Sequence, residues 1–496
     1  MSVFKKLAGE TVIYGISNIL PRILHYVIFT FYLTYKFSEQ SDYGIYLDLY
    51  AYAAMLLIVY RLGMETSFFR FATGEKANLE KSYSASSQTI LITSVFFTIL
   101  FIIFAPQVAD MLRYPDKVEY VYWFAVIIAL DALSAIPFAR FRIERRPVRF
   151  ASLKVFNTLF TIVLVVFFLD VCPYLIDHGW QDVFRFYDPA KKLDYVFMSN
   201  LIASAAVIIL LIPQIMKIKL EFDWSFLKKM ILYGLPMALV GAAGVFNQSF
   251  SIPIIKYILG DNITQNLAAA GVYGAAAKLA LIMNLFTVAY TYAAEPFFFT
   301  SSTRSDSREL YASSARLFAM FGSVFFLFIL LYQDIIVFVL GPNFRSETHV
   351  LPILLMSYIF LGLYYNVAIW YKIKDRTNIG ALISVGGAII TIAINFIFIP
   401  IAGVVTAAWA SFVCYAFMMM AGYLIGQKYF PVPYNLMKIG YYIGFALIIY
   451  VTNLYLRRFT DGLPVILSVN SALFLIYLLM IYITEKKWLI GVIRLK

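Results

Sequence analysis

Residues 136–168 read IPFARFRIERRPVRFASLKVFNTLFTIVLVVFF and contain the two features that decide the fold. An apolar run leads into a short turn with five arginines, and a second apolar run begins directly after that turn. An apolar run of about 20 residues is long enough to cross the hydrocarbon core of a bilayer as a helix. Arginines collect in turns on the cytoplasmic side of a membrane. The stretch therefore predicts two membrane helices joined by a cytoplasmic turn.

The whole chain of 496 residues repeats this pattern. Its residues are 62% hydrophobic and only 14% charged, whereas soluble domains are about 25% charged. The short alternating segments of a β-barrel are absent. We expect the first apolar run, which starts near Thr11, to be a retained helix and not a signal peptide. We predict an all-α polytopic membrane protein with about 14 transmembrane helices, at residues 11–33, 43–60, 85–105, 118–138, 150–170, 195–212, 230–250, 267–295, 312–332, 350–370, 379–399, 402–426, 439–456 and 463–484.

The basic residues give the topology. With the N-terminus placed in the cytoplasm, 26 of the 40 lysines and arginines fall in cytoplasmic segments and 10 in the opposite loops. This bias predicts that both termini are cytoplasmic, which requires an even number of helices. It also accounts for much of the net charge of +12. Nucleic acid is therefore not expected as a partner, because no soluble basic domain is present to bind it.

An internal repeat organises the helices. Residues 366–398 read NVAIWYKIKDRTNIGALISVGGAIITIAINFIF and align with residues 136–168 at an offset of 230. VIYGISNIL at 12–20 matches ILYGLPMAL at 231–239. Because each repeat holds six helices, an even number, the two repeats are parallel. We predict two lobes around a central cleft, residues 1–215 and 216–428, followed by two further helices and a cytoplasmic tail in residues 429–496.

Enzymatic motifs are missing from the sequence. There is no phosphate-binding loop, no dinucleotide fingerprint and no nucleophile elbow. The two cysteines and three histidines lack metal-ligand spacing. We therefore expect no catalytic residues, no metal and no cofactor, and a protein that is not an enzyme.

The first helix carries the most informative polar residues. Tyr14, Asn18, Arg22 and His25 follow one another at steps of four, four and three, so they share one helix face. A charge near the bilayer centre is tolerated when it faces protein or water. Arg22 is suited to bind an anionic group, because a guanidinium forms paired hydrogen bonds with the oxygens of such groups. Its alternative role is to pair with an acid such as Asp48, and both readings stay open.

Several stretches resemble the Wzx-type polysaccharide-unit flippases of the multidrug/oligosaccharidyl-lipid/polysaccharide (MOP, MATE-like) superfamily. They are LAGETVIYGISNILPRIL at 7–24, SDYGIYLDLYAY at 41–52, ARFRIERRPVRFASL at 139–153, ILYGLPMAL at 231–239 and AAGVYGAAAKLA at 269–280. The resemblance implies a multi-pass protein of the bacterial inner membrane that moves isoprenoid-pyrophosphate-linked oligosaccharides between leaflets by alternating access. It would serve lipopolysaccharide, O-antigen or other polysaccharide biosynthesis, with membrane lipids and polymerase or assembly proteins as further partners.

The resemblance also implies that the first two helices of each lobe line the cavity. Arg22, Asp48, Lys278 and Glu295 would then lie near one another. Tyr292 is two heptads after Lys278 and shares its helix face, while Asn247 and Gln248 could bind sugar hydroxyls. Asp48 and Glu295 are the candidates for titrating groups that couple transport to an ion.

Two other functions compete with this one. The first is an ion-coupled small-molecule antiporter of the multidrug (MATE) type, which needs a buried carboxylate in the first lobe. The first helix has no Asp or Glu within its span, although Asp48 and Asp131 keep the possibility open. The second is a flippase for the peptidoglycan lipid precursor, whose cargo also carries a pyrophosphate.

Overall fold

The computed structural model describes residues 20–21, 23–24, 29–73, 78–219, 223–301, 306–374 and 376–494. Within these ranges the chain is helical and contains no β-strand. Thirteen helices in the described ranges are long and apolar enough to cross a membrane, and they match the second to fourteenth helices predicted from the sequence. The predicted helix at 11–33, with Tyr14, Asn18, Arg22 and His25, lies largely outside the described residues. The all-α polytopic fold is thus confirmed.

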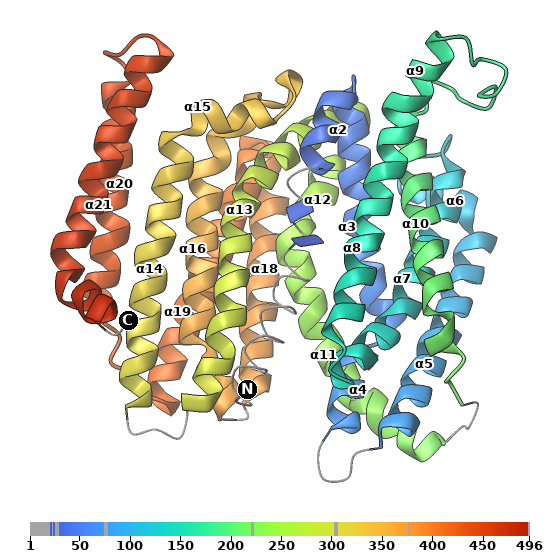
Figure 1. Cartoon of the computed structure of the whole chain (residues 1–496), viewed down its shortest axis with the longest axis horizontal. Coiled ribbons are helices and arrows are strands. Elements are labelled where there is room, and N and C mark those ends of the chain that lie inside the picture. Colours follow the sequence, from blue (N-terminus) through green and yellow to red (C-terminus); the bar gives the residue numbers. More distant parts are fainter. Residues whose placement is uncertain are drawn as a thin grey trace. The chain divides into compact units, whose positions relative to one another are not determined.

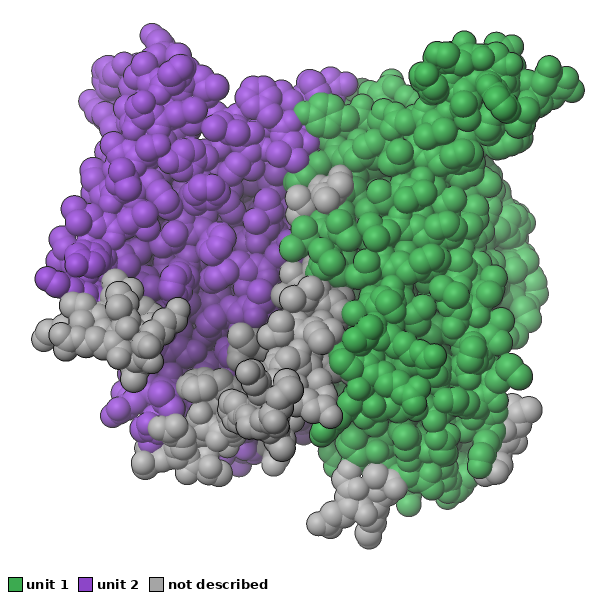
Figure 2. All heavy atoms as spheres, in the orientation of Figure 1, with its two compact units in different colours: residues 1–274 green, residues 275–496 purple. Residues whose placement is uncertain are grey.

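The chain forms two compact units, residues 1–274 and 275–496, coloured separately in Figure 2. The helices of the first unit are drawn in Figure 1. They are α2 (Thr30–Lys36), α3 (Gln40–Arg61), α4 (Met64–Ala72), α5 (Leu79–Ile103), α6 (Ala105–Met111), α7 (Val118–Ile143), α8 (Pro147–Val166) with a π-helical extension (Phe167–Val171), α9 (Cys172–Asp177), α10 (Lys192–Ile215), α11 (Trp224–Ser249), α12 (Ser251–Ile258) and the start of α13 (Ile263–Ser301).

Local sequence signals fix where several of these helices begin. Asn78 caps α5 by accepting a hydrogen bond from the Lys81 backbone N–H, and Asp223 caps α11 through Phe226 N–H. Such side chains satisfy backbone donors that a helix leaves unpaired at its first turn. Pro147 starts α8, where a missing N–H costs nothing. The Leu62–Gly63 pair, both with positive φ, turns the chain from α3 into α4.

The first unit has two distinct ends. We call the end with the connections 37–39, 112–117, 178–191 and 259–262 the upper end, as it is drawn in Figure 1. The other end, with the turns 62–63 and 144–146 and the starts of α5 and α11, is called the basic end. Between them α7 is the central helix, because it packs against α3, α5 and α10. Its Phe138 and Phe141 form an apolar core with Phe150, Val207 and Leu211.

The second unit is built around α14 and α16. Its helices are the rest of α13, α14 (Ser307–Leu331), α15 (Gln333–Ile336), α16 (Leu351–Val367), α17 (Ile369–Ile373), α18 (Thr377–Ala402), α19 (Val405–Tyr429), α20 (Leu436–Leu456) and α21 (Leu463–Arg494), with short 3-10 turns between α15 and α16. Helix α16 packs against α19 and α14, and α18 packs on α19. The last two helices, α20 and α21, pack against α14.

The internal repeat is visible in the backbone of both units. Helix α5 spans Leu79–Ile103 and α14 spans Ser307–Leu331, so both ends are displaced by 228 residues. In the turn after α7, Arg146 N–H donates to Phe141 O at 2.9 Å; in the turn after α17, Arg376 N–H donates to Tyr371 O at 2.7 Å. These two hydrogen bonds are 230 residues apart, the offset found in the sequence. The shared turn supports the predicted repeat.

One boundary differs from the predicted lobes. Residues 216–274 would open the second lobe, yet α11, α12 and the start of α13 belong to the first compact unit, because α11 and α12 pack on α3 and α4. Contacts and repeats divide the chain by different criteria, so the lobes 1–215, 216–428 and 429–496 stay a prediction.

Candidate functional site

The predicted site residues fall into three groups. Tyr14, Asn18, Arg22 and His25 lie outside the described residues. Asn247 is buried on α11, and its neighbour Gln248 is exposed. Lys278 is half-buried on α13 in the second unit. Tyr292 and Glu295 also lie on α13, and their side chains are outside the described part. The clustering of these residues with one another stays a prediction.

Asp48 is the predicted site residue whose hydrogen-bond partners the structure describes in most detail. Its side chain is fully buried on α3, 0% exposed. Lys256 of α12, also 0% exposed, donates to Asp48 Oδ2 at 2.6 Å. Tyr114, from the connection before α7, donates to the same oxygen at 2.7 Å. Among the described residues, Asp48 Oδ1 has no hydrogen-bond partner.

Lys256 is held by more than its carboxylate. Its ammonium also donates to Leu112 O at 3.0 Å, and the rings of Tyr52, Tyr114 and Tyr257 lie 4.6 to 5.1 Å from it. Aromatic faces attract a cation, most strongly when water is excluded. Burial, followed by the negative charge of Asp48, raises the pKa of Tyr114 well above its usual range. Tyr114 therefore stays protonated and acts as a donor.

A second polar network lies deeper in the first unit. Ser204 of α10 donates to Asp131 Oδ1 at 2.9 Å, and Asn200 hydrogen-bonds with Tyr50 of α3. Arg61 donates to the backbone oxygen of Asp131 at 3.0 Å. These groups join α3, α7 and α10 through hydrogen bonds between buried and half-buried polar side chains.

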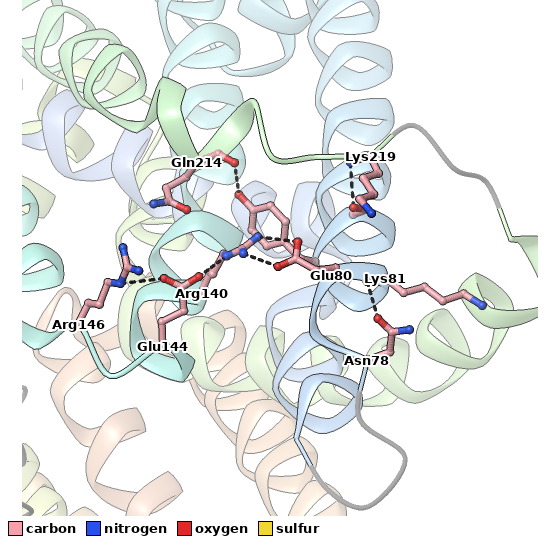
Figure 3. Close-up of polar contacts among 10 residues, drawn as sticks. Asn78, Glu80, Lys81, Arg140, Glu144, Arg146, Gln214 and Lys219 are labelled. Atoms are coloured by element: carbon pink, nitrogen blue, oxygen red, sulfur yellow. Dashed lines mark hydrogen bonds and ion pairs between the residues drawn. The ribbon is translucent and has the colours of Figure 1, made fainter.

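The basic end carries a cluster of ion pairs (Figure 3). Arg140 binds Glu80 through both terminal nitrogens, at 2.5 and 3.1 Å, and its Nε donates to Glu144 at 2.6 Å. The guanidinium carbon lies 4.5 Å from the centre of the Tyr83 ring. Only 5% of Arg140 is exposed. Arg140 therefore fixes the turn after α7 to the start of α5.

Beside this cluster is a cavity of about 420 Å³, open at the basic end. It is lined by cationic and anionic groups together, Lys81 and Lys219 with Glu80 and Asp223. Lys81 and Asp223 pair at 2.7 Å, which neutralises one charge of each sign. The lysine hydrogen bond is the main reason that the pKa of Asp223 lies well below its usual range. The cavity thus has no excess of positive charge that would select an anion.

The second unit contains its own polar centre. Tyr290 of α13 donates to Asn366 Oδ1 at 2.6 Å and shares a hydrogen bond with Ser314 Oγ of α14. A small cleft beside it is lined by Tyr290, Thr291, Tyr365, Tyr371 and Lys372. Aromatic rings, hydroxyls and one cation thus meet at the junction of α13, α16 and α17.

Ion pairs tie the last two helices to α14 at one end and to α15 at the other. Glu485 of α21, 3% exposed, binds Arg316 of α14 and Lys438 of α20, each at 3.3 Å. At the opposite end Arg457 binds Asp334 through two bonds of 2.6 and 3.0 Å. Arg316 is thus an ion-pair partner within the second unit.

Lys256 is the main functional candidate that sequence reasoning did not identify. The predicted helices end at residue 250 and resume at residue 267, so the sequence places Lys256 in an external loop, whereas the structure places it on α12. The signal that could have found it is the apolar stretch SIPIIKYI at 251–258, in which Lys256 is the sole charge. A lysine in such a segment needs a counter-charge.

Comparisons with known proteins give one family match and several structural matches. Residues 37–177 match the family model described as "Polysaccharide biosynthesis protein". No curated protein matches the sequence significantly. Among solved structures, the lipid II flippase MurJ in its inward closed conformation matches with a TM-score of 0.73 and 14% identity, over 95% of this chain and 99% of that one.

Two further structures carry the superfamily name. An inward-facing multidrug resistance MATE family transporter of the MOP superfamily matches with a TM-score of 0.60 and 12% identity, over 86% of this chain and 98% of that one. A MOP superfamily transporter from Pyrococcus furiosus Vc1 (DSM3638) matches with a TM-score of 0.57 and 13% identity, over 84% and 95%. These likenesses establish a shared fold.

Proposed function

Because the chain has the fold of the MOP superfamily and matches a polysaccharide biosynthesis family over residues 37–177, we propose that it is a flippase for lipid-linked oligosaccharides. Its cargo is an oligosaccharide on an isoprenoid pyrophosphate, made for lipopolysaccharide, O-antigen or a related polysaccharide. It carries this cargo across the bacterial inner membrane by alternating access, with both termini in the cytoplasm.

One observation carries the proposal. The family match and the structural match to a lipid II flippase fall on the same chain, and the structural match covers 95% of it. The fold alone would serve a multidrug transporter equally well, because MATE structures match too. The polysaccharide family match is the finding that favours a glycan cargo over a drug.

The chemistry of the chain agrees with an anionic, sugar-bearing cargo. Arg22 and Lys278 are cationic residues within predicted or observed membrane helices, and a desolvated pyrophosphate needs such partners. We assign Tyr14, Asn18, His25, Asn247, Gln248 and Tyr292 to hydrogen bonds with the headgroup or the sugars. Asp48 and Glu295 remain the candidates for coupling to an ion.

Flipping in proteoliposomes tests the proposal. The purified protein is reconstituted with a fluorescent isoprenoid-pyrophosphate glycan, and protection of the glycan from an added membrane-impermeant glycosidase is followed. Wild type should exchange the lipid between leaflets. Arg22→Ala should slow exchange at least about tenfold if it loses a charge-assisted pair to phosphate. Arg149→Ala, which removes an exposed arginine, is the matched control and should exchange normally.

The competing functions give different results in the same assay. Exchange of the peptidoglycan precursor in preference to other glycan lipids would indicate a peptidoglycan-precursor flippase. Failure to exchange any glycan lipid, together with ion-driven movement of organic cations, would indicate a multidrug antiporter. Polymerase or assembly partners can be sought by crosslinking in cells once the cargo is known.

A further inference from the structure

The buried pair of Asp48 and Lys256 joins segments from the two predicted lobes. Asp48, Leu112 and Tyr114 belong to residues 1–215, and Lys256 belongs to residues 216–428. One ammonium therefore holds α12 to both α3 and the connection before α7, through bonds of 2.6 Å to Asp48 and 3.0 Å to Leu112 O. All of these groups lie in the first compact unit.

A tight backbone contact lies between α3 and α13, close to the ion pair. We call this contact region between α3, α12 and α13 the seam. A Cβ on Gly44 of α3 would stand 2.0 Å from Leu267 O of α13, and a Cβ on Gly271 would stand 2.4 Å from Gln40 O. Asp48 is one turn further along α3 than Gly44. The two glycines let the α3 and α13 backbones touch, so the seam at the upper end is closed by backbone packing and by the ion pair.

The pair also differs from an ordinary structural ion pair. Asp334 has both carboxylate oxygens bound by Arg457. Asp48, although fully buried, receives both of its donors on Oδ2, and its Oδ1 has no partner among the described residues. Most buried polar atoms have a hydrogen-bond partner, and Asp48 Oδ1 is an acceptor that a further donor could occupy.

We propose that Asp48 and Lys256 form the lock that closes the upper end of the transport pathway, and that this pair separates each time the upper end opens. The proposal rests on the alternating access proposed above. When one partner of a buried pair is removed, the other is left as an uncompensated charge, which destabilises the closed seam. When both partners are replaced by neutral side chains of similar size, closure is restored, because no unpaired charge is left.

Cysteine labelling tests the lock without any cargo. Cys172 and Cys414, both buried, are replaced by alanine, and Ala51→Cys is introduced as the reporter. Ala51 is 3% exposed and lies on the same face of α3 as Asp48. The purified full-length protein is treated with a water-soluble maleimide in lipid nanodiscs. Labelling rates are compared for the parent, Asp48→Asn, Lys256→Met and the double variant.

The proposal expects a specific pattern of rates. Each single variant should label at least about tenfold faster than the parent, since leaving one buried charge unpaired shifts an equilibrium by more than that factor. The double variant should return to within about threefold of the parent. Arg457→Met is the matched control, because it breaks an ion pair of the second unit. It should leave the labelling rate unchanged.

Several results would overturn the lock. They are single variants that label at the parent's rate, a double variant as accessible as the singles, or faster labelling in Arg457→Met as well. If a single variant does not fold, Asp48→Glu takes its place, because it keeps the charge but displaces it; labelling at the parent's rate would then contradict the proposal. Labelling requires no glycan. A wrong cargo assignment would therefore show only in the flipping assay and would leave the labelling result unchanged.

Discussion

Gly44 shows how one missing side chain sets a helix contact. Its α-carbon packs against the α13 backbone so closely that a Cβ would stand 2.0 Å from Leu267 O. Small residues at helix interfaces allow such close approach, and packing of this kind is a main source of stability between helices in lipid. No other residue type fits here without moving one of the two helices.

We therefore predict that Gly44→Ala destabilises the protein by about 1–3 kcal/mol, the usual effect of overpacking a tight contact. The measurement is the melting temperature in detergent, followed by size-exclusion chromatography of heated samples. Gly244→Ala on α11 is the control, because a Cβ there meets no atom within 4 Å. It should be neutral or slightly stabilising, since alanine favours a helix more than glycine does. Equal losses in both variants would contradict the close contact.

Arg140 is the residue on which the basic end depends most. It is almost fully buried and binds Glu80 and Glu144 at once. We expect Arg140→Met to lower the free energy of unfolding by about 1–3 kcal/mol, less than for a fully buried pair because Glu80 is half exposed. Arg149→Met, at an exposed position near the start of α8, should change the melting temperature little. A similar drop in both variants would mean that only net charge matters.

At the scale of helices, most of the structure was predictable and most of the polar contacts were not. Helix positions follow from hydrophobic runs, and the described membrane helices begin within about six residues of their predicted starts. Partners such as Lys256 for Asp48 are 208 residues apart in sequence, and periodicity gives no information about which helices meet. The Arg22 stripe on the first helix stays a prediction, since it lies outside the described residues.

The start of α11 gives a pH-dependent prediction. The pKa of Asp223 is lowered mainly by its hydrogen bond with Lys81 and then by Phe226 N–H. A lowered pKa in the folded state means that the carboxylate stabilises the fold above its usual pKa of about 3.9, and that this contribution is lost as the pH falls. Asp223→Asn should therefore melt at a lower temperature than wild type by a constant margin between pH 5 and pH 8. The margin should shrink below about pH 4. If the difference in melting temperature between wild type and Asp223→Asn grew as the pH fell, the stabilising role of the Asp223 carboxylate would be excluded.

At the scale of the whole molecule, the distribution of basic residues predicts the topology. The basic residues indicate that the 140–149 turn faces the cytoplasm and that the 178–191 connection faces the other side. We expect Asp182→Cys, on an exposed loop, to react with an impermeant maleimide in intact spheroplasts. Lys217→Cys should react only after the membrane is broken. Labelling of Lys217→Cys in intact spheroplasts would reverse the proposed orientation.

The burial of Asp48 and Lys256 together also constrains how this protein can change over evolutionary time. A lineage that loses either charge alone passes through a destabilised intermediate, whereas a lineage that replaces both does not. Positions 48 and 256 should therefore vary jointly among relatives, as an acid facing a base or as two neutral side chains. The tyrosines at 52, 114 and 257 should persist mainly where the base is kept, since it is the cation that makes their ring faces useful.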